Sequence, residues 1–472
     1  MIRFKMLLLL SIVVGIAAFL ITMNGCGGVA SNGNHQPPPP GKINHVVIIF
    51  QENRTPDNLF HDPVLISRGA DIASSGKNSL GQTIQLTPGP LATDYDLGHS
   101  HHAFLSEWDN GAMDGADLIK VTCADGTSNC APPNPQFQYV QASDVQPYFT
   151  LAETYTFGDR MFQTNQGPSF PAHQYIISGT SAISEKSVMS VSENPTNTDT
   201  GFTGCIAPPG ATVKIIDTTD FNPLTNETQT TYPCFEHPTL TDLLDARSLS
   251  WKYYSPIAGS IWTGPNAIEH MCGPDQPPPN ATNCVGAEWT NHVVLGQTQV
   301  LTDISAGKLA AVSWVIPTNA ASDHAKGNDG SGPSWVASVV NAIGNSQYWK
   351  DTAIIIAWDD WGGWYDHVPP PGIHNSYEYG LRVPLIVVSP YAKAAFISHA
   401  THDFGSILKF IENNFGLPEI DPAVGYADSR SDDLSDCFDM NQTPLTFKQI
   451  PSKLDAQFFL NDKRPPEGPD DD

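Results

Sequence analysis

Two adjacent aspartates follow an apolar run in the second half of the chain. Ala353 to Ala357 is almost wholly apolar and rich in isoleucine, which is typical of a strand buried on both faces in a parallel sheet. Asp359 and Asp360 come directly after it, and Gly362-Gly363 then predicts a turn. Two neighbouring carboxylates are costly there unless a positive group binds them, which indicates a metal ion. The alternative is a pair of helix-capping aspartates.

A second acid follows another apolar run. His45 to Phe50 reads HVVIIF and is the first candidate for a buried strand. Glu52 and Asn53 stand at its carboxyl end. Because ligands of open α/β sheets collect beyond the carboxyl ends of the strands, these residues are candidates for the same site. The alternative for Asn53 is an ordinary turn residue.

A serine stands where a helix is expected to begin. Gly167-Pro168 predicts a turn, Ser169 follows, and Pro171 falls in the first helical turn. The hydroxyl of Ser169 either caps the helix or lies where backbone N–H groups and the helix dipole favour anions. The sequence has no Gly-x-Ser-x-Gly motif, which counts against an α/β-hydrolase esterase.

Five residues would present only oxygen atoms to a ligand if the fold brought them together: Glu52, Asn53, Ser169, Asp359 and Asp360. Oxygen ligands suit one hard divalent cation such as Ca²⁺, Mg²⁺ or Mn²⁺ better than zinc. Such a cation makes a serine hydroxyl a better nucleophile. Histidines could hold phosphoryl oxygens and protonate the leaving group, so the reaction class that uses all these parts is phosphate-ester hydrolysis.

The elements that must position these residues alternate between strands and helices. Further strands are expected at 251–254, 310–316 and 383–388, and helices at 239–247, 335–343 and 404–415. This order predicts an α/β fold with a doubly wound, mostly parallel sheet flanked by helices. Two polar, loop-rich stretches, about 185–235 and 256–290, are expected to be insertions in a single domain of residues 43–460.

The amino terminus predicts export. Two basic residues precede a long apolar run that ends before Gly25-Cys26, as in a secretory signal peptide (1–25) with a rough lipoprotein cleavage site. Cys26 is the expected lipidation site, and an uncleaved anchor helix is the alternative. Residues 26–42 are expected to be a flexible, Pro-rich tether, and 461–472 an acidic tail. The expected location is the periplasm or the cell surface, otherwise the medium.

The charge of the chain excludes some partners. The net charge of the 472 residues is −26, and removal of residues 1–25 takes away two basic residues and no acidic ones. Such a surface disfavours nucleic acid and anionic lipid, so membrane contact is expected only through the N-terminal lipid anchor. Phosphate chemistry must therefore concentrate positive charge locally. The sequence does not indicate an oligomeric state.

Seven cysteines remain besides Cys26. Their spacing in an exported protein suggests three disulfides, Cys123–Cys130, Cys205–Cys234 and Cys272–Cys284, and leaves Cys437 buried and inert. Cysteine metal sites are the alternative, although no Cys-x-x-Cys pair occurs.

Seven motifs along the chain resemble those of one known group of enzymes and occur in the same order as in that group. They are FQENRTPDNLF, the D-x-x-H of Asp96 to His99 followed by GAMDG, GPSFPAHQYIISGTS, SDH at 322–324, AWDDWGGWYDHVPPP, RVPLIVVSPYAK and FGSILKFIE. Together they cover most of residues 43–440. The chain thus resembles the bacterial phosphoesterase family of phospholipases C and a respiratory-burst-inhibiting acid phosphatase, which is related in fold to alkaline phosphatases.

The resemblance implies roles for named residues. Glu52, Asn53, Ser169, Asp359 and Asp360 would bind one metal ion, with Ser169 as the nucleophile. His99 and His324 would contact the phosphoryl group together with Asn53. His367, in YDHV, would bind the substrate or support the ligands from behind.

The sequence also departs from the family pattern. Many relatives have Asp-Glu in place of Asp359-Asp360, and the pair seen here is nearer the acid-phosphatase branch. Many have Pro-Asn-Arg in place of Pro171-Ala172-His173, which puts the substrate preference in doubt. His173 could take over a phosphate contact, but a solvent-facing side chain is favoured.

Three functions are therefore weighed. The first is an exported, metal-dependent phosphoric ester hydrolase that forms a phosphoserine and prefers phosphomonoesters. The second is a phospholipase C that acts on phosphodiester lipids, although no membrane-inserting helix is evident beyond the amino terminus. The third, of another class, is a cell-surface binding protein that keeps the fold without catalysis.

Overall fold

An eight-stranded sheet forms the centre of the domain, with the strand order β13-β12-β14-β1-β15-β16-β8-β17. The computed structural model describes residues 41–198 and 201–466. The strands of this sheet are β1 (His45–Gln51), β8 (Thr156–Gly158), β12 (Trp251–Ser255), β13 (Val293–Leu295), β14 (Val312–Val315), β15 (Thr352–Trp358), β16 (Leu385–Val388) and β17 (Phe396–Ser398).

Strand β1 lies between β14 and β15 and is parallel to both. Every residue of β15 is buried, and so is every residue of β1 after His45, because helices cover both faces of the sheet. The register pairs Gln51 of β1 with Trp358 of β15, so the two strands end level with each other. The residues that follow these two strands are therefore neighbours.

Strand β16 runs antiparallel to both β15 and β8, and it is the reversed strand of the sheet. The connection from β15 to β16 contains no helix, which suits an antiparallel neighbour because a parallel one needs a crossover. The remaining pairs in the sheet are parallel. The expected doubly wound, mostly parallel sheet is confirmed.

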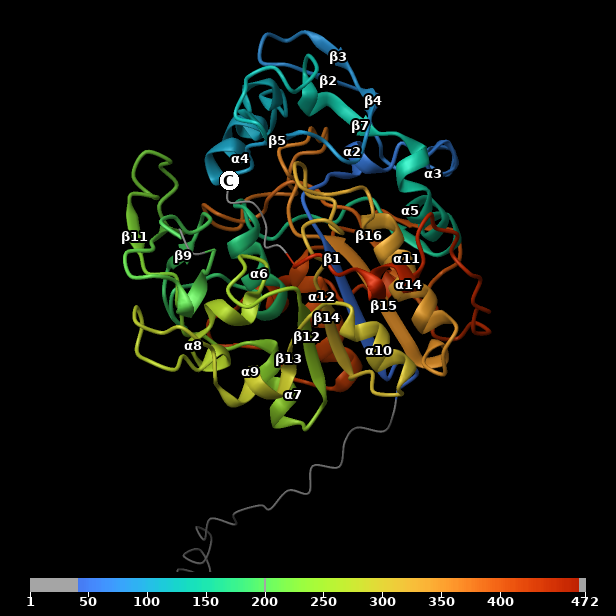
Figure 1. Cartoon of the computed structure of the whole chain (residues 1–472). Coiled ribbons are helices and arrows are strands. Elements are labelled where there is room, and N and C mark those ends of the chain that lie inside the picture. The colour runs from blue at the N-terminus through green and yellow to red at the C-terminus, as the bar shows by residue number, and fades with distance from the viewer. Residues whose placement is uncertain (1–40, 199–200, 467–472) are drawn as a thin grey trace, which may run out of the picture. The chain divides into compact units, whose positions relative to one another are not determined.

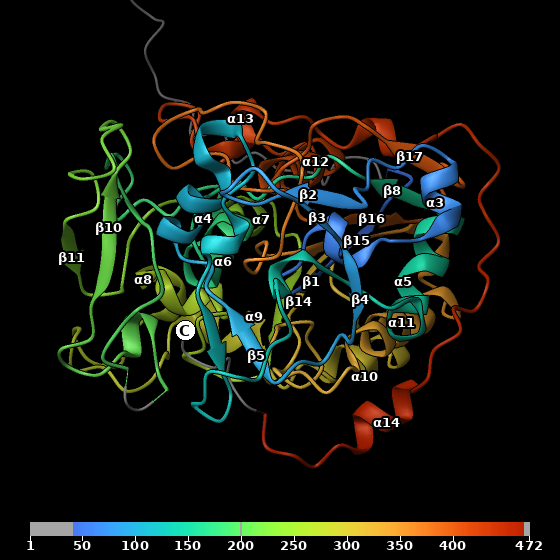
Figure 2. The same ribbon diagram turned by 90° about the horizontal axis from the view of Figure 1, so that it is seen from above.

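Helices cover both faces of the sheet. Figure 2 shows α12 (Phe404–Phe415) on one side of β15 and β16, and α10 (Gln299–Ser305) and α11 (Gly332–Gly344) on the other. Helix α12 contacts α6 (Ser169–Ser178), and α11 contacts α5 (Ala142–Thr154). Helix α7 (Leu240–Ala246) packs on α6. Their apolar sides and the strands share one hydrophobic core.

Residues 56–140 form small elements above the carboxyl ends of the central strands (Figure 1). They are α2 (Pro56–Leu59), α3 (Pro63–Ser67), β2 (Ser75–Lys77), β3 (Thr83–Gln85), β4 (Thr87–Gly89), β5 (Tyr95–Leu97), α4 (His101–Trp108), η1 (Asp109–Gly111), η2 (Ala116–Leu118), β6 (Val121–Cys123), η3 (Pro135–Phe137) and β7 (Gln138–Val140). This segment forms a roof over the strand ends.

The stretch expected as a polar insertion, 185–235, contains a three-stranded antiparallel sheet of its own. Its strands are β9 (Met189–Val191), β10 (Val213–Asp217) and β11 (Gln229–Thr231), with η4 (Gly204–Ile206) between β9 and β10. The second stretch, 256–290, holds η5 (Gly264–Ala267), α8 (Glu269–Cys272) and the start of α9 (Ala287–His292). All three expected disulfides are present, and Cys437 is free and buried as expected.

The chain ends in short elements, namely α13 (Ala427–Arg430), η7 (Ser435–Cys437) and α14 (Ala456–Asn461), while η6 (Trp349–Asp351) leads into β15. The expected signal peptide, Cys26, the tether up to residue 40 and the acidic tail beyond 466 lie outside the described residues. Within the described part of the chain, no helix is both long and apolar enough to cross a bilayer.

Candidate active site

The ends of β1 and β15 bring four of the predicted residues together. The backbone N–H of Asp359 donates to the carbonyl oxygen of Gln51 at 3.0 Å, which continues the strand pairing past β15. The N–H of Asn53 donates to Oδ1 of Asp359 at 3.1 Å. Glu52, Asn53, Asp359 and Asp360 are fully buried side by side. No helix begins after Asp360, so the helix-capping alternative is wrong.

The turn at Gly362 and Gly363 allows a close backbone approach. Both glycines have positive φ angles, 65° and 70°, which side chains rarely adopt. A Cβ at Gly362 would meet the carbonyl oxygen of Asn53 at 2.4 Å, and one at Gly363 would meet Cβ of Leu97 at 2.7 Å. The two glycines therefore let the turn contact both segments that carry Asn53 and His99.

Ser169 is the first residue of α6 and is buried. Pro168 occupies the cap position and no side chain caps this helix, so the expectation that Ser169 is an N-cap is not met. The hydroxyl of Ser169 instead donates to Oδ2 of Asp360 at 3.3 Å. The side chain thus joins the aspartate pair at the positive end of the α6 dipole.

Two histidines, His99 and His324, lie next to this cluster of acids. Nδ1 of His99 donates to the carbonyl oxygen of Leu97 at 2.8 Å, so Nε2 accepts from the side-chain amide of Asn53 at 3.0 Å. The rings of His99 and His324 are 5.7 Å apart between centroids. His324 is held by a hydrogen bond from Nδ1 to the carbonyl oxygen of Ala325 and packs beside Trp262.

His173 is a site residue that the sequence interpretation placed in solvent, and that expectation is wrong. The side chain is fully buried, and Nε2 lies 3.3 Å from Oε1 of Glu52 and 3.7 Å from Oδ2 of Asp359. His173 follows Ser169 by four residues on one helix, so the two share a face. That spacing was the available signal. Burial lowers the pKa of His173 to about 4, against the opposing charge of Asp359, and keeps the ring neutral.

Tyr253 decides which nitrogen of the neutral His173 ring carries the proton. The hydroxyl of Tyr253 donates to the carbonyl oxygen of Trp262 at 2.8 Å, so it has no second proton for His173. Nδ1–H therefore donates to the hydroxyl oxygen at 3.3 Å. Nε2 then presents a lone pair to Glu52 and Asp359, an arrangement that only a proton or a cation among them stabilises.

The oxygen and nitrogen atoms that Glu52, Asn53, His173 and Asp359 present to one another fit a cation bound between them. Oε2 of Glu52, Oδ1 of Asn53 and Oδ2 of Asp359 are buried without a hydrogen-bond partner. Burial raises the pKa of Glu52 well above its ordinary value, and the nearby charge of Asp359 raises it further. Glu52, His173 and Asp359 can offer ligand atoms within 4.8 Å of one another. Such a cluster of buried acids is costly without a compensating positive charge.

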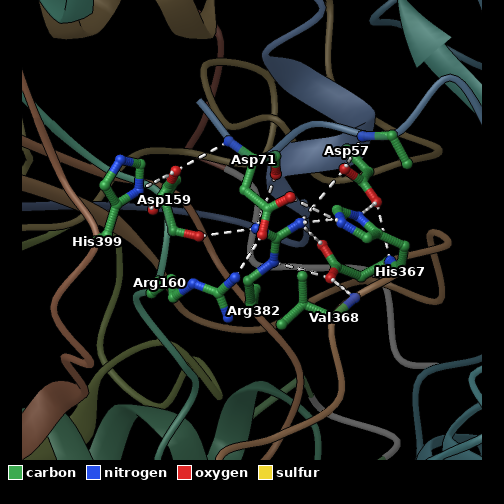
Figure 3. A network of polar contacts seen from close by, with 10 residues as sticks. Asp57, Asp71, Asp159, Arg160, His367, Val368, Arg382 and His399 are labelled. Atoms are coloured by element: carbon green, nitrogen blue, oxygen red, sulfur yellow. Dashed lines mark hydrogen bonds and ion pairs between the residues drawn. The ribbon is translucent and has the colours of Figure 1, made fainter. Parts of the chain in front are cut away.

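His367 takes part in a different network, shown in Figure 3. Nδ1 lies 2.7 Å from Oδ2 of Asp57 and Nε2 lies 3.0 Å from Oδ1 of Asp71. Buried Arg382 donates to Asp366 and Asp57 in the same network. Both ring nitrogens of His367 thus face carboxylates, which does not match the expected contact with substrate. The ring lies beside Asp57 of α2, the first helix after β1.

A cavity of about 700 Å³ opens beside the candidate site. It is lined by His99 and by Pro168, the residue before Ser169, and also by residues of the first insertion. This volume lies within the usual range of about 300–1,000 Å³ for ligand pockets. The cavity therefore provides room for a ligand beside His99 and the residue that precedes Ser169.

Comparison with solved structures finds a protein of the alkaline phosphatase superfamily from Vibrio parahaemolyticus, with a TM-score of 0.35, 11% identity and coverage of 84% of this chain and 71% of that one. Among curated proteins, the chain is similar to phospholipase C B of Mycobacterium tuberculosis, 24% identical over 459 residues, which are 86% of this chain and 80% of the relative.

It is also 24% identical over 475 residues to the non-hemolytic phospholipase C of Burkholderia pseudomallei, which covers 87% of this chain and 61% of that protein. Residues 43–418 match the family model described as the Phosphoesterase family, over most of the chain and in agreement with the resemblance of the motifs. The chain belongs to the phosphoesterase family and is a hydrolase of phosphoric esters.

Proposed function

We propose that the protein is an exported, metal-dependent phosphoric ester hydrolase in which Ser169 is the nucleophile and phosphomonoesters are the preferred substrates. One observation carries the proposal. The hydroxyl of Ser169 stands at a helix start 3.3 Å from Asp360, and Glu52 and Asp359 in the same cluster each keep one buried carboxylate oxygen without a hydrogen-bond partner. Neither a core nor a surface needs such a cluster, whereas a phosphate site uses every part of it.

Glu52, Asn53, Ser169, Asp359 and Asp360 would hold one divalent cation, and the lone pair of His173 Nε2 faces the same point. When bound, the cation would neutralise the acids, lower the pKa of the serine hydroxyl and attract phosphoryl oxygens. Five oxygens alone favour Ca²⁺, Mg²⁺ or Mn²⁺, but an added imidazole nitrogen favours a transition metal such as Mn²⁺ or Zn²⁺.

The remaining steps use the side chains of the chain itself. Ser169 gives its hydroxyl proton to Oδ2 of Asp360, which accepts its hydrogen bond, and Oγ attacks phosphorus. A new O–P bond forms, and the bond to the leaving alcohol breaks with its electron pair passing to the alcohol oxygen. Asn53 and, once protonated, His99 and His324 hold the phosphoryl oxygens, and one of the two histidines gives its proton to that alcohol. Water then attacks the phosphoserine, releasing phosphate and restoring the Ser169 hydroxyl.

The second candidate is a phospholipase C, which the names of the relatives favour. Its leaving group would be diacylglycerol, which needs an apolar surface. Carbon atoms form most of the wall of the cavity beside His99, but charged and hydroxyl groups of side chains such as Lys120, Lys214 and Thr122 also line it. These polar groups would be left unpaired against an acyl chain. We therefore favour a polar alcohol as leaving group. A substrate panel of phosphatidylcholine against soluble monoesters separates the two candidates.

Export is proposed on two grounds. Three disulfides form in the described residues, as expected of a protein that folds in an oxidising compartment. The amino-terminal sequence has the pattern of a signal peptide, and lipidation at Cys26 would anchor the mature protein. The alternative of a non-catalytic binding protein requires that the purified protein bind a cation yet hydrolyse no phosphate ester.

The test of the proposal is the Ser169→Ala variant on a chromogenic phosphate monoester. Loss of the nucleophile is expected to lower kcat at least about a thousandfold while the protein stays folded. Ser305→Ala, at the exposed end of α10, is the matched control and is expected to keep wild-type turnover. Undiminished turnover by Ser169→Ala would end the claim that this serine is the nucleophile.

A further inference from the structure

Most of the lining of the cavity beside Ser169 comes from two segments of the chain that are far apart in sequence. The roof supplies His99 and Lys120, and the first insertion supplies Lys214 on β10 and Thr230 on β11. The N–H of Gly98 donates to the carbonyl oxygen of Lys120 at 2.9 Å, which fixes Lys120 beside the loop that carries His99. The cavity therefore reaches His99, one of the residues expected to contact the phosphoryl group.

The charge of this cavity is opposite to that of the molecule. The chain has only 23 basic residues against 49 acidic ones, yet Lys120, Lys214 and Lys326 all line this one cavity. Lys326 follows His324 by two residues, so it lines the cavity close to a residue that is expected to contact the phosphoryl group. Within the described part of the chain, Lys120 and Lys214 form no ion pair. Three clustered cations in an acidic protein attract an anion.

Two acids also line the cavity, Asp96 and Glu193. Burial raises the pKa of Glu193 to about 8, and the neighbouring charge of Glu227 adds to the effect. Glu193 is therefore largely uncharged at neutral and acidic pH. Glu227 accepts a hydrogen bond from Ser192 at 2.6 Å and faces His101, so its charge is already partnered. The three lysines that line the cavity thus outnumber its one charged acid, Asp96.

Apart from His99 and His102, the other polar side chains of the wall are hydroxyls and an amide. They belong to Ser100, Thr122, Asn194, Thr196, Thr212 and Thr230. Such groups bind the hydroxyls of a sugar or a glycerol skeleton, and they would be left unpaired against an acyl chain. The wall therefore matches a short, hydroxylated leaving group that also carries a negative charge.

We propose that this cavity binds the alcohol portion of the substrate, and that Lys120, Lys214 and Lys326 select phosphomonoesters whose alcohol carries a second anionic group on a hydroxylated skeleton. The proposal rests on the function proposed above. It makes the insertion sheet β9–β11 a wall of the specificity pocket, since β10 supplies Lys214. A phosphorylated sugar acid or a bisphosphate has the required chemistry.

The test compares two esters that differ in one group, 3-phosphoglycerate with a carboxylate and glycerol 3-phosphate with a hydroxymethyl group. The wild-type kcat/KM is expected to be about tenfold higher for 3-phosphoglycerate, which corresponds to one charged contact. In the double variant Lys120→Gln, Lys214→Gln that ratio is expected to fall towards one. The double variant Lys308→Gln, Lys350→Gln changes two exposed lysines outside the cavity, so it removes the same amount of charge, and it is expected to keep the wild-type ratio.

Binding is measured separately by calorimetry on the Ser169→Ala protein, with and without the two lysine substitutions. The proposal expects tighter binding of 3-phosphoglycerate than of glycerol 3-phosphate, and loss of that difference in the lysine variant. Equal binding of the two esters, or a preference that survives the lysine substitutions, would overturn it. If wild type hydrolysed neither ester, the proposed function would fail, while the binding difference would still decide the role of the cavity.

Discussion

At the scale of single residues, the site is a set of buried oxygens with one nitrogen among them. The oxygens were expected from the sequence because each stands at the end of an apolar run or at a helix start. The burial of His173 was not expected, because a solvent-facing ring was favoured although its four-residue spacing from Ser169 places both on one face of α6. The hydrogen bond from Tyr253 to Trp262 fixes the tautomer of His173 and turns its Nε2 lone pair towards Glu52 and Asp359.

This orientation predicts a metal preference. In His173→Asn, the affinity for Zn²⁺ is expected to fall about tenfold or more, because imidazole is a preferred zinc ligand and an amide oxygen is not. The affinity for Mg²⁺ is expected to change less. Calorimetric titration of the metal-free protein with each ion measures both effects.

The matched control is His45→Asn, at the amino end of β1 and therefore at the opposite end of the sheet from the site. It is expected to leave both affinities unchanged. Equal losses of Zn²⁺ and Mg²⁺ affinity in His173→Asn would show that the imidazole supports the fold of the site without preferring a metal.

At the scale of elements, the parallel strands β1 and β15 and the start of helix α6 position the side chains of the candidate active site. A separate hydrogen-bond network connects the segments that follow the two strands. Asp57 of α2 and the loop carrying Asp366, His367 and Arg382 meet in that network (Figure 3). Burial of His367 opposes its charge, but the hydrogen bond and the charge of Asp57 raise its pKa to about 9. The segments beyond β1 and β15 are thus joined by a protonated histidine.

This network predicts a loss of stability at alkaline pH. Since the pKa of His367 is higher in the folded state than its ordinary value of about 6.5, its contribution is fully present below pH ~6.5 and is lost as the pH rises through about 9. The wild-type Tm is therefore expected to fall between pH 7 and pH 9.5. In His367→Asn the Tm is expected to be lower at pH 6 and nearly flat over the same range. An equal slope in wild type and variant would remove His367 as the cause.

The sequence predicts the elements better than their pairing. β1, β12, β14 and β15 were expected within a residue or two, because an uninterrupted apolar run is a local signal. The reversal of β16 and the separate sheet of β9–β11 were not expected. Both depend on which strands meet across long stretches of chain, and local composition carries little information about that.

At the scale of the whole molecule, a strongly acidic chain places three lysines around one cavity beside the candidate active site. The expected gathering of residues 52, 53, 169, 359 and 360 was predictable because their motifs stand in family order and because strand ends meet at one edge of a parallel sheet. The lysine-lined cavity was not predictable, since Lys120, Lys214 and Lys326 come from separate segments that only the fold brings together.

Anomalous scattering from crystals of the purified protein, recorded at the absorption edge of the metal it carries, locates the cation. One strong peak is expected within about 2.0–2.6 Å of oxygens of Glu52, Asp359 and Asp360, with Ser169 Oγ and His173 Nε2 facing it. A peak elsewhere, for example at His101, His102 and Glu227, with none between the two strand ends, would contradict this expectation.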